Sequence, residues 1–267
     1  MLTQFAIRLI CGLSVVWCVM PRAQVTSGFF RIQMLVTLGL SALAGISAGH
    51  FMGDDAAPTL LSPLALQVVA GTLGLLSFIG SVAWTLERRS GGGRFGFAIA
   101  AISTVTLILN CVSQKSLSTL AGNLYWLSEL ATAGVSGAAV GGMLLGHWYL
   151  TAPTMSTSPL NRVNVWLGFW AGLRLLLAIV AMAMFHAAVF GDGTSSNSGA
   201  SSTHLVWLSL QWLCGMLGPL ACSVMVQRIM KYRNTQSATG VLFVGVIFAF
   251  LGEMAGALLR NELQLPL

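Results

Sequence analysis

Long apolar runs alternate with short polar segments along the whole chain. A helix needs about 20 residues to cross the hydrocarbon core of a bilayer, and these runs reach that length. Strands of a membrane β-barrel would instead give short segments of alternating hydrophobicity. The pattern predicts an all-α, multi-pass transmembrane bundle of about eight helices, at residues 3–21, 31–51, 63–86, 95–113, 124–150, 163–190, 203–230 and 239–260.

Composition supports the same class. The chain is 56% hydrophobic and only 7% charged, whereas roughly a quarter of the residues in soluble domains are charged. No polar stretch is longer than a loop, so residues 1–267 are expected to form a single integral membrane domain whose first apolar run is retained rather than cleaved. The five cysteines form no CxxC or CxxCH motif, so we predict neither a metal site nor c-type haem attachment.

The basic residues separate by connection. The first, third, fifth and seventh connections contain or border nine of the thirteen lysines and arginines: Arg22, Arg31, Arg88, Arg89, Arg94, Arg162, Arg228, Lys231 and Arg233. Positive residues favour the cytoplasmic side, so we expect both termini outside, in the inner (plasma) membrane of the cell. The net charge of +6 therefore indicates topology and no nucleic-acid partner. Tryptophans near the ends of the runs, such as Trp17 and Trp84, predict an interfacial aromatic belt.

The last apolar run contains an acid, Glu253, which is costly within a membrane. Small residues that line one side of this helix predict a close contact with another helix: Gly245, Ala249, Gly252 and Gly256. Arg174 is the other strong charge that we place near mid-membrane, so we expect it to pair with Glu253. The pair would either lock the sixth helix to the eighth or form the polar interior of a head-group pocket or proton path.

Histidines offer further chemistry. His50 falls at the outer end of the second predicted helix and His186 near the outer end of the sixth. Two such imidazoles could ligate haem b, one could bond a quinone head group and take its proton, or they could have no specific role. In the fifth helix, Glu129 and His147 share a face about 27 Å apart. Ser136 lies between them. The three residues either form a sparse polar track or share this face by chance.

Two segments resemble a known family. Residues 49–53 read Gly-His-Phe-Met-Gly with Pro58 following, and residues 252–256 read Gly-Glu-Met-Ala-Gly. Both are similar to elements of the eight-helix quinol-interacting anchor subunits of DMSO and polysulfide reductase complexes. The proline is displaced from the histidine, and Ala257 stands where that family often has arginine. The resemblance implies a quinol site near the outer ends of the second and eighth helices, and partner subunits that carry iron–sulfur clusters.

The sequence thus favours a quinone-binding membrane subunit of a respiratory redox complex, with catalysis left undecided. The residues predicted to line its cofactor site are His50, Glu129, His147, Arg174, His186 and Glu253. One alternative is a small-molecule or ion transporter or channel with a midplane Arg–Glu site, and another is a haem b cytochrome. A third follows from residues 134–138, Gly-Val-Ser-Gly-Ala, which resemble the nucleophile motif of rhomboid proteases, with Ser136 as nucleophile and His186 as base.

Overall fold

A computed structural model describes residues 2–50, 61–114, 120–152, 154–190 and 202–263 of the chain. Within these ranges the regular structure is entirely helical, as predicted. The helices are α1 (Leu2–Val19), α2 (Ser27–His50), α3 (Pro63–Thr85), α4 (Arg89–Gln114), α5 (Leu120–Trp148), α6 (Ser158–Phe190), α7 (Ser202–Leu210), the π-helix η1 (Gln211–Leu217), α8 (Gly218–Met230) and α9 (Thr235–Leu263).

The prediction of eight spans is confirmed, because eight helical segments among the described residues are long and apolar enough to cross a membrane. Seven of them are single helices. The seventh span, Val206–Met230, is composite and joins α7, η1 and α8 into one rod. The change from π-helix to α-helix falls just before Pro219, whose ring has no N–H and cannot continue the regular α-helical ladder.

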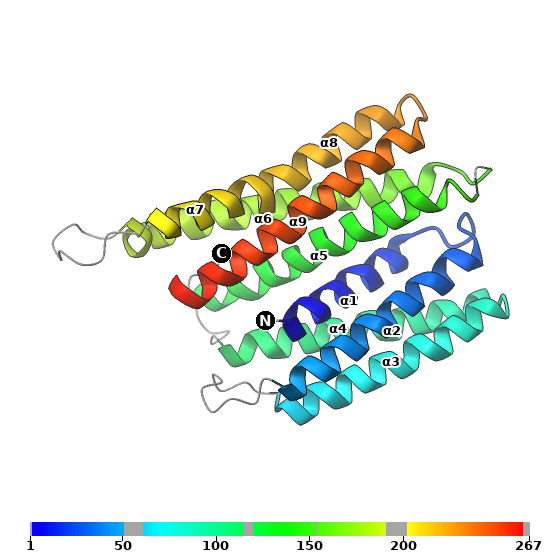
Figure 1. The fold of residues 1–267 in the computed structure, drawn as a ribbon, viewed down its shortest axis with the longest axis horizontal. Coiled ribbons are helices and arrows are strands. Elements are labelled where there is room, and N and C mark those ends of the chain that lie inside the picture. Colours follow the sequence, from blue (N-terminus) through cyan, green and yellow to red (C-terminus); the bar gives the residue numbers. More distant parts are fainter. Residues whose placement is uncertain (1, 51–60, 115–119, 153, 191–201, 264–267) are drawn as a thin grey trace.

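The spans form two groups of four. In the first group α1 packs against α2 and α4, and α3 packs against α2 and α4. In the second, α5 packs against α6 and α9, while the seventh span packs against the same two helices. Contacts between α1 and α5 join the groups (Figure 1). In both groups each span therefore packs against the next one, and the fourth packs against the first. Each group contains an even number of crossings, so α1 and α5 start at the same end of the bundle.

The join between the groups depends on two glycines. A Cβ atom added to Gly137 of α5 would overlap the backbone of Gly12 in α1, and one added to Gly12 would overlap the carbonyl of Ala133. Small residues permit this close approach of two membrane helices. As a result, side chains one turn from the crossing on α1 and α5 face one another inside the bundle.

The two ends of the bundle differ. At one end, here called the terminal end, α1 begins and α9 finishes; the opposite end, called the basic end, carries the connections after α1, α3, α5 and α8 (Figure 1). Two of the tryptophans predicted for an interfacial belt are instead core residues. Trp17 and Trp84 are buried, and Trp84 stacks on Phe30 with ring centroids 4.5 Å apart.

Candidate functional site

A buried arginine in α1 bridges two glutamates from other helices. The Nε and Nη2 atoms of Arg8 donate hydrogen bonds to the two carboxylate oxygens of Glu129 in α5, at 2.5 and 2.7 Å. Its Nη1 atom donates to Oε1 of Glu253 in α9, at 3.0 Å. The three residues are 2%, 1% and 3% exposed. Arg8 therefore forms a bidentate ion pair with Glu129 and a monodentate ion pair with Glu253.

Two neutral side chains complete this arrangement. Gln4 donates from Nε2 to Oε2 of Glu129 at 3.2 Å, and the hydroxyl of Ser136 donates to Oε2 of Glu253 at 3.1 Å. Every carboxylate oxygen of the two glutamates thus accepts at least one hydrogen bond. We refer to Gln4, Arg8, Glu129, Ser136 and Glu253 as the Arg8 network.

Local sequence explains why these side chains meet. Arg8 lies four residues before Gly12, so it is one helical turn from the crossing of α1 and α5. Glu129 lies four residues before Ala133 on the other side of the same crossing. Ser136 is two turns further along α5 and faces the same way, because seven residues make close to two full turns. The crossing therefore aligns the polar positions of both helices.

The depth of the network differs from the sequence-based expectation. Arg8, Glu129 and Glu253 lie six or seven residues inside the terminal-end limits of their spans, which corresponds to about 10 Å along a helix. The hydrocarbon core is about 30 Å thick. Each of the three residues therefore lies on the terminal-end side of the middle of its span, whereas the sequence pattern predicted Glu253 near mid-membrane.

The predicted partner of Glu253 is also corrected. Arg8 supplies the ion pair of Glu253, and Arg174 of α6 instead donates from Nη1 to the backbone carbonyl of Gly215 at 3.2 Å. That carbonyl lies four residues before Pro219, which has no N–H to offer it. The buried Arg174 thus stabilises the irregular seventh span.

The small-residue side of α9 packs as predicted against another helix. Gly252 contacts Gly215 so closely that a Cβ on either residue would approach the other's backbone. One turn later Gly256 faces Gln211, which is fully buried and whose amide nitrogen and oxygen have no hydrogen-bond partner among the described residues. The seventh span thus occupies the glycine side of α9, and Glu253 points past it toward α1 and α5.

Other predicted site residues lie outside the network. His147 is exposed on the last turn of α5, at the basic end. His50 and His186 belong to α2 and α6, but their side chains lie outside the described part of the structure. Among the residues described, no group of three or more His, Cys, Asp or Glu side chains could hold a metal ion. The quinone and haem assignments therefore stay predictions.

Sequence reasoning missed Arg8 and Gln4. Arg8 is the seventh residue of α1 and has apolar neighbours on both sides. A lone charge at that position was the available signal, because a membrane helix rarely holds one without a partner. Ser136, considered as a protease nucleophile, has its hydroxyl bonded to Glu253.

The eight spans and the buried network define an integral membrane protein with an ionic interior. No protein-family model, curated protein or solved structure gives a significant match to the chain.

Proposed function

We propose that this protein is a proton-coupled transporter of an ion or small molecule, in which Glu253 carries the exchangeable proton. The observation that carries this proposal is the position of the Arg8 network, where α1 of one four-helix group meets α5 of the other. In transporters built from two similar halves, coupling sites lie where the halves meet. Ionisable residues inside a membrane also mark proton and ion pathways more often than inert structure.

The two carboxylates have different hydrogen bonds. Glu129 accepts two bonds from Arg8 and one from Gln4, whereas Glu253 accepts one from Arg8 and one from a neutral hydroxyl. Charge-assisted bonds are about twice as strong as neutral ones. Protonating Glu253 therefore loses less hydrogen-bond energy than protonating Glu129. Glu129 is accordingly the permanent counter-ion of Arg8, and Glu253 is the site of proton exchange.

The proton step needs only groups in the network. A proton from water at the terminal end binds Oε2 of Glu253, which becomes a hydroxyl donor. Ser136, which donates to this oxygen in the ionised state, can rotate its hydroxyl and accept instead. Arg8 keeps its two bonds to Glu129. Neutralising Glu253 weakens the link between α1 and α9, so α9 can shift against α1 while Arg8 still holds α1 to α5 through Glu129.

Polar side chains lead from the network to the terminal end. Gln4 is one turn from Arg8 in that direction and is only half-buried. Beside it, Thr3 shares a hydrogen bond of 2.9 Å with Ser47 of α2. Toward the basic end, Gly12 and Gly137 bring the backbones of α1 and α5 into direct contact, which blocks a path between these helices. This arrangement supports access from the terminal side, which the positive-inside rule assigns to the exterior.

Infrared difference spectroscopy tests the proton site without knowledge of the substrate. Protein reconstituted in liposomes is titrated, and the C=O stretching band of a buried protonated carboxyl group is followed. We expect Glu253→Gln to remove that band. Glu87→Gln, at an exposed turn of the basic end, is the matched control. A band that persists in Glu253→Gln would refute the assignment.

The quinone-binding subunit is the second candidate function, and a groove between α2 and α3 supports it. The groove has a volume of about 680 Å³ and is mostly apolar, and Gly45 and Gly71 are among the residues that line it. Gln67 lines it too and packs against Gly49, the residue before His50. An isoprenoid tail would lie in the groove with its head group near Gln67 and His50. Iron–sulfur subunits would then be the electron partners.

Filling the groove separates this candidate from the transporter. Gly71 has open space where its Cβ would lie, so Gly71→Leu is expected to narrow the groove. Gly39→Leu is the control, because Gly39 is equally open and does not line the groove. Loss of decylubiquinone binding in Gly71→Leu alone would support a quinone site. Equal binding by both variants would exclude this groove, and unchanged quinol oxidation in His50→Ala would exclude that histidine.

A further inference from the structure

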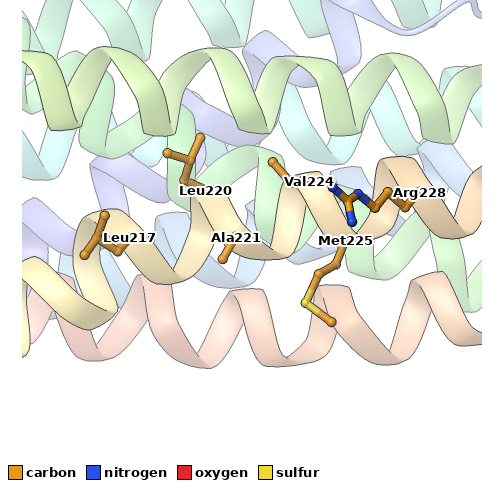
Figure 2. Close-up of a pocket in the computed structure, with 6 residues that line it drawn as sticks. All are labelled: Leu217, Leu220, Ala221, Val224, Met225 and Arg228. Atoms are coloured by element: carbon orange, nitrogen blue, oxygen red, sulfur yellow. The ribbon is translucent and has the colours of Figure 1, made fainter.

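A shallow groove runs along the outer face of α8 near the basic end (Figure 2). Its volume is about 490 Å³, and its walls come from Leu217, Leu220, Ala221, Val224, Met225 and Arg228. These positions recur every three or four residues, so they form one continuous stripe on the helix. Ala221 lies midway along the stripe and has the smallest side chain, which leaves a hollow between its larger neighbours (Figure 2).

The length of the groove corresponds to one leaflet of a bilayer. Leu217 and Arg228 are eleven positions apart, or about 16 Å along a helix. Half of a hydrocarbon core is about 15 Å. The groove thus begins near the middle of the membrane and finishes at the interface of the basic end, where Arg228 stands two residues before the last residue of the span.

Charge at the interface end is positive only. Arg228 is exposed, and Lys231 and Arg233 follow it in the exposed connection to α9. Residues 218–252 contain no aspartate or glutamate. Each basic residue beside an anionic membrane surface contributes about 1 kcal/mol of attraction. An apolar groove of one leaflet's depth with a cationic end matches a lipid with an anionic head group.

We propose that the α8 groove binds one anionic phospholipid, with an acyl chain against Ala221 and the phosphate at Arg228. A second copy of this chain is a poorer occupant. A symmetric contact through α8 would bring two sets of Arg228, Lys231 and Arg233 together, and like charges repel. The lipid also extends the role of the basic end beyond topology, because its charge selects a ligand. This site is separate from the Arg8 network and does not depend on the proposed transport function.

Native mass spectrometry of the detergent-purified protein tests the site. Phosphatidylglycerol and phosphatidylcholine with identical chains are the probes, and glycerol phosphate tests whether the head group alone suffices. The wild type should retain one phosphatidylglycerol in preference to phosphatidylcholine and should bind no glycerol phosphate. Arg228→Gln should lower the affinity for phosphatidylglycerol about fivefold, since about 1 kcal/mol of attraction is lost with one basic residue. Ala221→Phe, which fills the hollow with an apolar ring, should lower it while keeping every charge.

Arg31→Gln is the matched control, because Arg31 is also exposed near the basic end but belongs to α2. It should bind phosphatidylglycerol as the wild type does. Equal losses in Arg31→Gln and Arg228→Gln would overturn the proposal in favour of a diffuse surface charge. Full binding by Ala221→Phe would also overturn it, since the groove would then be irrelevant. Arg31, Ala221 and Arg228 are all exposed, so these variants are expected to fold.

Discussion

Replacing Arg8 with methionine tests whether the buried network is a single energetic unit. Methionine keeps most of the length and the apolar stem of arginine but removes all three charge-assisted hydrogen bonds. Glu129 and Glu253 would then be two buried acids with no cation between them. Gln4 would still donate one hydrogen bond to Glu129, and Ser136 one to Glu253. Each carboxylate is therefore left only partly satisfied.

The size of the effect follows from the burial. Removing one partner of a buried ion pair costs about 3–5 kcal/mol, because the remaining charge is uncompensated. Arg8 is shared by two acids, so we expect the upper part of that range for Arg8→Met. Exchanging all the charges for apolar groups of similar size is often close to neutral. The triple variant Arg8→Met, Glu129→Met, Glu253→Met should therefore recover most of the lost stability.

Unfolding in mixed micelles by increasing SDS, followed by tryptophan fluorescence, measures these differences in free energy. Arg31→Met is the control for loss of a cation, because Arg31 is exposed. Its stability should change by less than about 0.5 kcal/mol, as is usual for surface substitutions. If Arg8→Met is as stable as Arg31→Met, or if the triple variant is no better than the single one, the proposed coupling of the three charges is wrong.

Two further predictions concern packing and ionisation. Gly137→Val should destabilise the protein by about 1–3 kcal/mol by overpacking the crossing of α1 and α5, whereas Gly39→Val, in open space, should not; equal SDS stability of the two would refute the crossing. Burial raises the pKa of Tyr149, at the basic end, from 10 to about 12. Its contribution to stability is full below pH 10 and is lost as the pH rises toward 12, so Tyr149→Phe should flatten the stability curve over that interval; an unchanged curve would refute it.

The number and position of the spans could be predicted from the sequence alone, because both depend on local properties. Each span is a run of apolar residues of the length that a bilayer requires. The close packing of the glycine side of α9 could also be predicted, since a repeat of small residues every three or four positions defines one face of a helix. The energetic cost of placing Glu253 within a membrane could be predicted as well, because the residues around it in the sequence form an apolar run.

The partner of Glu253 was decided only by tertiary structure. Arg8 is 245 positions away, and it reaches Glu253 because Gly12 and Gly137 bring α1 against α5 while α9 packs beside them. Hydropathy gives each charge an approximate depth but does not say which helices are neighbours or which way a side chain faces. Arg174 had a suitable charge, yet it bonds to the carbonyl of Gly215. The packing of helices, rather than the inventory of charges, selects the ion pairs in this membrane interior.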